Sequence, residues 1–424
     1  MNFIEELSWR GMIQDSTPGA KEALSKGGVL GYCGFDPSAS SLQVGNLAAI
    51  MMMMHFQRRG NKPFALVGGA TGIIGDPSGK SSERNLLTAD AVEHNLSQFK
   101  KQLCKFLDFS EGKFQAEIIN NYDWISPISF LDFLRDVGKH VTVGYMLGKD
   151  AVKNRLESGI SYTEFSYQLL QAYDYYHLHK TKGISVQFGG SDQWGNIVGG
   201  TELIRRIDGA TAHGITQPLV LRADGTKFGK SADGQKLWLD PTMTTPYQFY
   251  QFWLNSEDNM CERYLKVFTL LSQEEIREIT AEHENAPHLR AMQKALAREA
   301  TTLVHSKEDY EAALSASQIL FGDAGYEDLR SLSSEMFLSV FEGVPHKAVP
   351  FDEINAKSIV DVAVFADALF PSKSEVRRNI NAVSVNKNKV SDDKYTFSDA
   401  DLLHGKYILL QKGKKNYFII EALR

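Results

Sequence analysis

The sequence predicts an α/β fold, a doubly wound parallel sheet with helices on both faces, for the first half of this 424-residue chain. Short β-rich runs alternate there with helical stretches at the spacing of βαβ units. Residues 29–35 and 63–69 are expected to form strands, and residues 42–59 between them a helix that ends at Gly60. Further along we expect a helix over 88–107 and strands over 116–122 and 184–188.

The connection after the third predicted strand is long. Residues 123–160 extend it beyond an ordinary crossover, and we expect this insertion to form a dimer contact. Ser161 and Glu164 have the spacing of a capping box, which predicts a helix that runs to about residue 179. Two later helix starts, at Ser272 and Ser306, predict consecutive helices.

These patterns divide the chain into four predicted segments. Residues 1–244 form the doubly wound domain with its insertion, and residues 245–330 a helical domain. Residues 331–357 contain two prolines and show no sustained period, which is typical of a linker. Residues 358–424 are expected to form a small α+β domain.

The composition favours a cytoplasmic enzyme. With 43% hydrophobic residues the chain can bury a large core, and no apolar run reaches the roughly 18 to 20 residues that span a bilayer. The three cysteines are far apart and outside any CxxC pair, so neither a disulfide framework nor a zinc site is suggested. The net charge is −6, yet residues 371–424 contain eleven Lys and Arg against six Asp and Glu, so a basic tail follows an acidic body.

Two predicted strands end in segments suited to binding a nucleotide. Residues 32–37 end the first strand, and Gly45 and Asn46 follow near a helix start, where free N–H groups can bind phosphate. The second strand leads into residues 68–80, where Asp76 suits an ammonium group. Two cations suited to phosphates follow the strand end, Lys80 at the end of this stretch and Arg84 just after it. Taken alone, an ordinary strand–loop–helix or a solvated loop explains each segment as well.

Two further segments place polar groups together. Tyr167, Gln171 and Asp174 share one face of the helix after Ser161, and a bound polar ligand could supply their hydrogen-bond partners. Residues 187–196 then form another strand end with paired glycines, a carboxylate and amides. Residues 224–231 form a loop whose two lysines could close on negative charge that develops at phosphorus, namely Lys227 and Lys230. A solvated helix edge and a solvated turn are the plain alternatives.

Together these segments resemble the class I aminoacyl-tRNA synthetases, and more narrowly the bacterial-type tyrosyl enzymes with their Rossmann-like catalytic domain. Five motifs follow in order between residues 32 and 231, namely YCGFDP, GGATGxxGDP, EFSYxLLQxYD, GGSDQWGN and KFGKS. The resemblance extends over nearly the whole chain. It implies a homodimeric enzyme that activates L-tyrosine with ATP and Mg²⁺ and then transfers tyrosine to the 3′ end of tRNA(Tyr).

The resemblance also implies roles for individual residues. Tyr32 and Asp174 would bind the phenolic hydroxyl of tyrosine. The ammonium group would be held by Asp76, Tyr167 and Gln171, with Gln193 near the carboxylate. The ATP site would comprise Gly34, Asp36, Ser38, Gly45, Asn46, Gly190, Asp192 and Lys230, with Gly190 and Asp192 at the ribose. The pyrophosphate would be stabilised by Lys80, Arg84, Lys227 and Lys230, and no resident metal is expected.

One position departs from the family pattern. The first family signature is HxGH or HxGN, and this chain has Gln43 in place of the first histidine, while Asn46 matches the accepted variant. Gln43 can donate a neutral hydrogen bond to phosphate but cannot become cationic. We expect it to serve the ATP site with a modestly weakened activation step.

The basic tail supports the same resemblance. Residues 372–380 predict a short basic helix, followed by hairpins over 383–390 and through 412–415. Such a surface suits an RNA backbone, and it resembles a small RNA-binding fold shared with a ribosomal small-subunit protein. RNA contacts are expected at Lys373, Arg377, Arg378, Lys414 and Lys415.

Two other interpretations stay open from the sequence alone. A tryptophan-specific synthetase would share the fold, although Tyr32, Asp174 and the basic tail argue against it. A catalytically idle relative that only binds structured RNA would account for Gln43.

Overall fold

The chain forms two compact units. The structure is a computed structural model that describes all residues except 79–86, 154, 156–158, 224, 227, 230–235, 322–324, 343 and 414–415. The first unit comprises residues 1–244 and 252–304, and the second residues 245–251 and 305–424. Helix α12 (Pro246–Leu254) contributes residues to both. A unit boundary falls between residues 244 and 245, but residues 252–304 return to the first unit, so residues 245–330 are divided between the two units.

A six-stranded sheet forms the centre of the first unit, in the order β1-β6-β5-β2-β3-β4. Its strands are β1 (Asp15–Ser16), β2 (Leu30–Phe35), β3 (Lys62–Val67), β4 (Glu117–Asn120), β5 (Val186–Gly190) and β6 (His213–Gln217). β1 pairs antiparallel with β6, and the other neighbours pair in parallel. This confirms the predicted fold class. The sequence did not predict β6, because its five residues include a single large apolar side chain.

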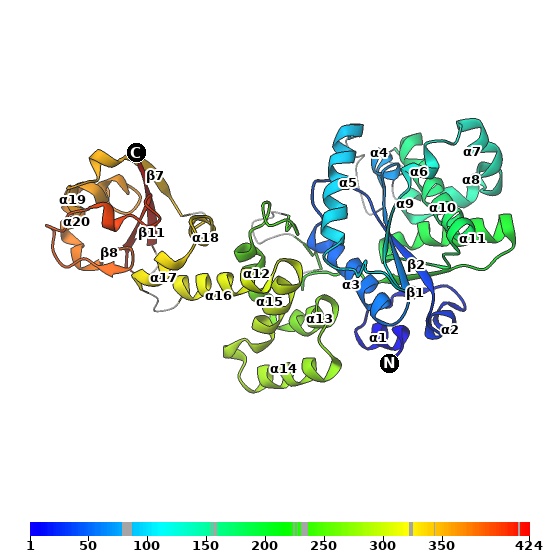
Figure 1. Cartoon of the computed structure of the whole chain (residues 1–424), viewed down its shortest axis with the longest axis horizontal. Helices are drawn as coiled ribbons and strands as arrows, with labels where there is room; N and C mark the ends of the chain where they lie inside the picture. Colours follow the sequence, from blue (N-terminus) through cyan, green and yellow to red (C-terminus); the bar gives the residue numbers. More distant parts are fainter. Residues whose placement is uncertain are drawn as a thin grey trace. The chain divides into compact units, whose positions relative to one another are not determined.

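Helices cover both faces of this sheet (Figure 1). α3 (Val44–Arg58) and α5 (Ala89–Leu103) lie on one face, and α10 (Tyr162–Lys182) and α11 (Trp194–Asp208) on the other. Shorter helices complete this part of the unit, namely α1 (Phe3–Trp9), α2 (Ala20–Ser25) and α4 (Thr71–Ile74). The helices expected over 42–59, 88–107 and 161–179 are thereby confirmed.

Helix α10 begins at the predicted cap. Ser161 Oγ accepts a hydrogen bond from the Glu164 N–H at 3.2 Å. The Glu164 carboxylate forms a buried ion pair with Arg155 at 2.9 Å. Removing one partner of such a pair leaves an uncompensated buried charge, so this contact ties the start of α10 to the insertion before it.

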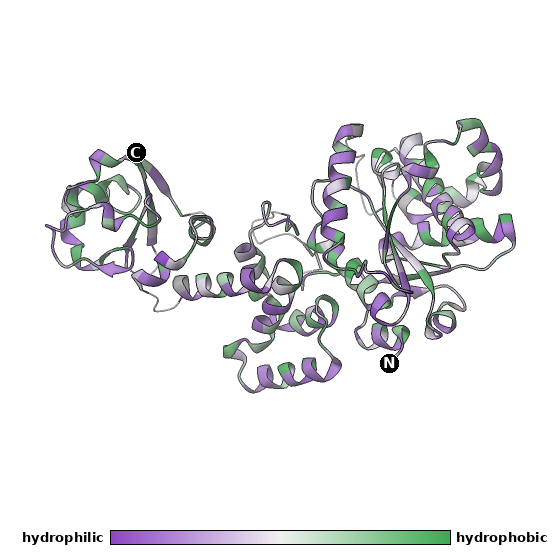
Figure 2. Ribbon diagram, in the orientation of Figure 1, coloured by the Kyte–Doolittle hydropathy of each residue, from purple (hydrophilic) through white to green (hydrophobic). Residues whose placement is uncertain are grey.

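The insertion between β4 and α10 consists of short helices. They are α6 (Tyr122–Ile125), α7 (Phe130–Asp136), α8 (Val143–Leu147) and α9 (Asp150–Lys153). Large apolar side chains are exposed there, with Phe130 at 64%, Leu131 at 76% and Val143 at 63% exposure. In Figure 2 the ribbon of this insertion carries both hydrophobic and hydrophilic residues. Exposed large apolar side chains that gather in one patch mark interaction surfaces.

Three helices after α12 belong to the first unit: α13 (Asp258–Phe268), α14 (Gln273–Asn285) and α15 (Ala291–Val304). Ser272 and Glu275 form the reciprocal capping box that starts α14 as predicted. α13 packs against α3, and Arg10 donates hydrogen bonds to the carbonyls of Lys266, Thr269 and Leu271 at the end of α13. These contacts explain why the helices join the sheet in one compact unit.

The second unit contains a five-stranded sheet in the order β7-β11-β10-β8-β9. Its strands are β7 (His346–Pro350), β8 (Val383–Val385), β9 (Asn388–Lys389), β10 (Tyr407–Lys412) and β11 (Asn416–Leu423). Its helices are α16 (Lys307–Phe321), α17 (Tyr326–Ser331), α18 (Ser334–Val340), α19 (Ile359–Val362) and α20 (Lys373–Arg378). The core of the sheet includes Phe370, Ile408 and Ile420, all fully buried. The predicted basic helix and both predicted hairpins are present.

The segment expected to be a linker, residues 331–357, differs from that expectation. It contains α18 and β7, and β7 pairs in parallel with β11 at the edge of the sheet. Along β7 only Val349 is buried, so the alternation of apolar and polar residues that reveals a strand is missing. None of the described helices is long and apolar enough to span a membrane.

Candidate active site

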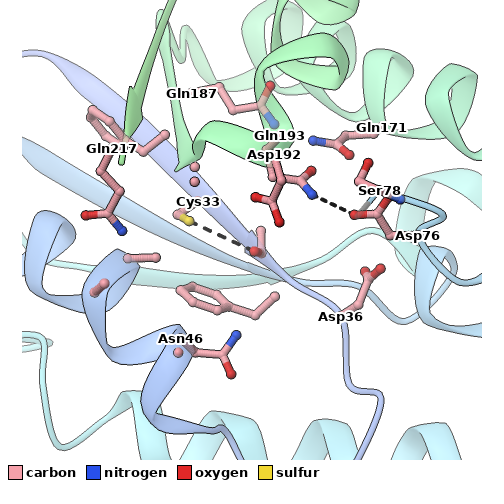
Figure 3. A pocket seen from close by; sticks show the side chains of 18 of the residues that line it. Cys33, Asp36, Asn46, Asp76, Ser78, Gln171, Gln187, Asp192, Gln193 and Gln217 are labelled. Atoms are coloured by element: carbon pink, nitrogen blue, oxygen red, sulfur yellow. Dashed lines mark hydrogen bonds between the residues drawn. The ribbon is translucent and has the colours of Figure 1, made fainter. Parts of the chain in front are cut away.

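A cavity of ≈ 380 Å³ lies at the carboxyl ends of the parallel strands of the first unit. Ligands of open α/β sheets bind at this edge. Figure 3 shows Asp36, Asp76 and Gln171 on one side of the cavity, and Asn46 and Gln217 on the other.

Most of the predicted site residues line this cavity. From the tyrosine set these are Tyr32, Asp76, Tyr167, Gln171, Asp174 and Gln193, and from the ATP set Gly34, Asp36, Ser38, Gly45, Asn46, Gly190 and Asp192. Gln43 is not among the described lining residues. The four predicted phosphate cations lie outside the described residues, namely Lys80, Arg84, Lys227 and Lys230.

One side of the cavity is organised around the Asp36 carboxylate at the end of β2. The Tyr167 hydroxyl donates to Asp36 Oδ2 at 2.8 Å, and the Thr71 hydroxyl donates to Oδ1 at 2.7 Å. Gly68 permits this approach, because a Cβ at that position would lie 2.1 Å from Asp36 Oδ1. Burial and the nearby carboxylates raise the pKa of Tyr167 well above its ordinary value, so its hydroxyl stays protonated and donates.

Asp174, two helical turns along α10 from Tyr167, is 2% exposed. Trp124 Nε1 donates to its Oδ1 at 2.8 Å, and Asn121 Nδ2 donates to its Oδ2 at 3.0 Å. Burial raises the pKa of Asp174 to about 7, against the opposing effect of these two hydrogen bonds. The carboxyl group therefore titrates close to neutral pH.

Tyr32 points its hydroxyl into the same region. This oxygen is buried and has no hydrogen-bond partner among the described residues. Burial, with a smaller contribution from Asp174, raises the pKa of Tyr32 well above its ordinary value. A buried hydroxyl without a partner is costly, so a polar group of a ligand is expected to complete it.

A third carboxylate, Asp76, lies in the segment that follows β3 and the short helix α4. Gln193 Nε2 donates to Asp76 Oδ2 at 2.6 Å, and the Ser78 N–H donates to Oδ1 at 2.8 Å. Asn196 Nδ2 reaches the Ser78 hydroxyl at 3.3 Å. The loop after β3 is thereby joined to the GGSDQWGN segment after β5, as Figure 3 shows for Gln193 and Asp76.

The opposite side of the cavity is formed by the N-terminus of α3 and by the segment after β6. Asn46 Oδ1 accepts from the N–H of Gln43, the residue that precedes the helix, at 2.9 Å. The Val44 N–H donates to the Leu237 carbonyl at 3.0 Å, and the Leu237 N–H to the Gly229 carbonyl at 3.1 Å. Backbone hydrogen bonds therefore connect the first signature segment with the base of the KFGKS loop.

Phe228 anchors that loop. Its ring packs against Phe252, Trp253, Tyr264 and Phe268, with ring centroids 4.7 to 5.5 Å apart. Such aromatic packing holds the backbone between the two lysines of the motif against α13.

Sequence reasoning missed several residues of the site. Thr71, Asn121, Trp124, Gln187 and Gln217 hold site carboxylates or line the cavity. Thr71 and Gln187 lie within predicted segments but were given no role, Asn121 and Trp124 lie just after β4, and Gln217 ends β6, a strand that was not predicted.

In the second unit, Lys373, Arg377 and Arg378 lie on α20 with their side chains 57%, 60% and 77% exposed. Each has an acidic neighbour within 4.0 Å, and such exposed pairs are weak. Lys414 and Lys415 lie outside the described residues.

Comparison with known proteins agrees with this geometry. The family model for "tRNA synthetases class I (W and Y)" matches residues 26–322, and the "Tyrosine--tRNA ligase SYY-like C-terminal domain" matches residues 337–420. The chain is 54% identical to the Tyrosine--tRNA ligase of Bacteroides thetaiotaomicron over the full length of both proteins. This chain belongs to the tyrosyl-tRNA synthetases.

Other tyrosyl-tRNA synthetases support the same membership. The Porphyromonas gingivalis enzyme is 53% identical over 99% of both chains. The crystal structure of a C-terminally truncated mitochondrial tyrosyl-tRNA synthetase from Aspergillus nidulans is 32% identical, with a TM-score of 0.69 over 76% of this chain and 94% of that chain. A tryptophanyl-tRNA synthetase from Encephalitozoon cuniculi shares the fold at 11% identity and a TM-score of 0.51.

Proposed function

We propose that this chain is a tyrosine--tRNA ligase that activates L-tyrosine with ATP in the cavity of its first unit and then transfers tyrosine to tRNA(Tyr). The observation that carries the proposal is the buried Tyr32 hydroxyl without a partner, which lines the same cavity as the Asp174 carboxylate. Together these groups offer a donor and an acceptor to a phenolic hydroxyl, which phenylalanine could not satisfy.

The tyrosine substrate lies along the face of α10. Its hydroxyl is bound by Tyr32 and Asp174, and its ammonium group by Asp76, Tyr167 and Gln171. The Gln171 Oε1 atom supports this placement, because it is buried without a partner among the described residues. Gln193, which is hydrogen-bonded to Asp76, orients the carboxylate of tyrosine.

ATP occupies the opposite side of the cavity. Its ribose lies at Gly190 and Asp192, and its phosphates at the N-terminus of α3, beside Gly45 and Asn46. Gln43 precedes this helix outside the described lining, and its amide would donate to the phosphates as a neutral group. Gly34 and Ser38 also belong to the ATP set, and Asp36 contributes to it from the facing side of the cavity. Mg²⁺ accompanies the triphosphate and neutralises part of its charge.

Activation requires no covalent enzyme intermediate. The carboxylate of tyrosine attacks the α-phosphorus, the bond to the pyrophosphate breaks, and tyrosyl-adenylate stays bound. Lys80, Arg84, Lys227 and Lys230 stabilise the departing pyrophosphate. Catalysis then rests on the orientation of two bound reactants and on the stabilisation of charge that appears in the transition state.

The transfer of tyrosine to tRNA involves the basic C-terminal segment, residues 371–424. The ribose of the 3′ end of tRNA(Tyr) attacks the adenylate, while the basic helix α20, with Lys414 and Lys415, binds RNA. The catalytic residues fall within the predicted domain 1–244, and the RNA contacts within 358–424.

The active protein is a homodimer. The insertion exposes apolar side chains on α7 and α8, namely Phe130, Leu131, Leu134, Val143 and Leu147. A twofold contact would bury them against the same patch of a second copy. Leu131→Glu is expected to shift the protein to monomers in sedimentation experiments, whereas a dimer of unchanged stability would contradict this interface.

Tyrosine-dependent exchange of labelled pyrophosphate into ATP tests the proposed activity. Exchange is expected with tyrosine and not with tryptophan. Absence of exchange with tyrosine would refute catalysis and favour a protein that only binds RNA, and equal exchange with tryptophan would refute the assigned specificity.

A further inference from the structure

Gln217 is a buried amide at the end of β6 that no step of the proposed reaction uses. It is 5% exposed and lines the cavity, and its side chain forms no hydrogen bond within the described residues. In Figure 3 the side chain extends from its strand into the side of the cavity that α3 closes. The amide faces the cavity, where a polar group of a ligand can pair with its oxygen and its nitrogen.

The cavity-lining residues that follow Gln217 along the chain are apolar. Pro218, Leu219, Val220 and Phe228 line the same part of the cavity. The backbone there is held in place, because the Val220 carbonyl accepts from the Phe228 N–H at 3.2 Å and the Leu221 carbonyl accepts from the Tyr264 hydroxyl at 3.0 Å. An apolar wall with one amide is suited to a flat heterocycle that presents a donor beside an acceptor.

The register of the sheet specifies which part of ATP would reach this amide. Gln217 pairs with Gly190 across β5 and β6, and Gly190 is the residue assigned to the ribose in the proposed function. A base attached to that ribose lies beside the end of the neighbouring strand. The edge of adenine carries the N6 amino donor next to a ring-nitrogen acceptor, a pair that a glutamine amide can match with two hydrogen bonds.

We infer that Gln217 binds the 6-aminopurine ring of ATP and contributes to selection of the nucleotide. This inference rests on the proposed function for the position of the ribose. It adds a specificity residue at the base to the residues assigned to the ribose and the phosphates.

The test compares the chain with Gln217→Met, which keeps the length of the side chain and removes both polar atoms. The KM for ATP in tyrosine-dependent pyrophosphate exchange should rise about five- to twentyfold in the variant, with the KM for tyrosine unchanged. With purine riboside 5′-triphosphate, which lacks the amino group, the two proteins should differ far less. With 2′-deoxyATP, which keeps the base, the full difference should persist.

Thr216→Val provides the matched control, because Thr216 precedes Gln217 in β6 and its hydroxyl bonds to Asp15 at 3.0 Å. It should leave the KM for ATP unchanged. An equal rise with ATP and with purine riboside triphosphate, a rise that disappears with 2′-deoxyATP, or no rise at all would overturn the inference.

Calorimetric titration with the same nucleotides separates this inference from the proposed function, since it requires no turnover. ATP binding that weakens in Gln217→Met, in a protein without exchange activity, would count against the proposed reaction and support the base contact. ATP binding that is equal in both proteins would overturn the base contact whatever the exchange activity.

Discussion

Trp124 donates its indole N–H to Asp174 at 2.8 Å, from a helix turn that follows β4 to the buried face of α10. With Asn121 on the other carboxylate oxygen, both oxygens have fixed donors. The carboxylate therefore keeps one orientation before any ligand binds, and its remaining lone pairs are left for a substrate hydroxyl.

Asp174→Ala is expected to lower kcat/KM for tyrosine about a hundredfold or more, because a charge-assisted hydrogen bond to the substrate is lost in a buried site. The corresponding value for phenylalanine should change little. Pyrophosphate exchange with each amino acid gives both values. Unchanged tyrosine kinetics in a folded variant would refute the role of Asp174.

Tyrosine binding should weaken as the pH falls through about 7, where Asp174 titrates, because the protonated carboxyl loses an acceptor for the phenolic hydroxyl. The effect on stability has the opposite sign. The folded protein holds this proton more tightly than the unfolded chain, so the contribution of Asp174 to the free energy of unfolding is greatest in acid and is lost as the pH rises to about 7. A KM for tyrosine that stays constant from pH 8 to 6 would contradict this assignment.

Gly68→Ala should disturb the site through Asp36. The added Cβ would lie 2.1 Å from Asp36 Oδ1 and 2.3 Å from Thr71 Oγ1, so the hydrogen bond between these residues cannot persist unchanged. We expect a loss of about 2 kcal/mol in the free energy of unfolding, from overpacking, and a lower kcat/KM for tyrosine. Gly144→Ala is the control, because its Cβ would meet nothing within 4 Å. Equal changes in the free energy of unfolding and in kcat/KM for the two variants would show that the contact between Gly68 and Asp36 does not matter for the site.

The sequence predicted much of this site because its motifs lie at strand ends. Tyr32 lies in β2, Asp36 and Asp76 come after β2 and β3, whose apolar runs are clear, and the parallel sheet brings these ends together. Gln217 was missed because β6 alternates too weakly to be recognised as a strand. Asn121 and Trp124 were missed because their partner, Asp174, lies about fifty residues away, and no local pattern records such a contact.

In the second unit, too, structure that depends on residues far apart in the sequence could not be predicted. The hairpin of β10 and β11 was predictable from local alternation around a glycine turn. β7 was not, because it is an edge strand with a single buried residue and its partner, β11, lies far along the chain.

Phe228→Ala should slow activation more than it weakens tyrosine binding. The substitution removes the aromatic contacts that hold the KFGKS loop on α13, and the lysines of that loop act on the pyrophosphate in the proposed reaction. We expect kcat to fall about tenfold with little change in the KM for tyrosine. Phe228→Leu, which keeps an apolar side chain, should show a smaller fall. The prediction fails if both variants retain the original kcat.

Replacing Lys373, Arg377 and Arg378 of α20 together with alanine should raise the KM for tRNA and leave pyrophosphate exchange unchanged, because these exposed cations lie outside the catalytic unit. The dependence of log affinity on log salt should become shallower by about two to three. A triple variant at the exposed Lys21, Lys26 and Lys113 of the first unit controls for net charge. Equal loss in both triple variants would argue against a specific RNA contact on α20.

In the proposed reaction, the buried polar groups of Tyr32 and Asp174 select tyrosine by its hydroxyl. The most direct test is the ratio of kcat/KM for tyrosine over phenylalanine in pyrophosphate exchange, measured for the chain and for Tyr32→Phe. We expect a preference for tyrosine of several orders of magnitude that falls clearly in the variant. A preference that is small in the original chain, or unchanged in Tyr32→Phe, would contradict it.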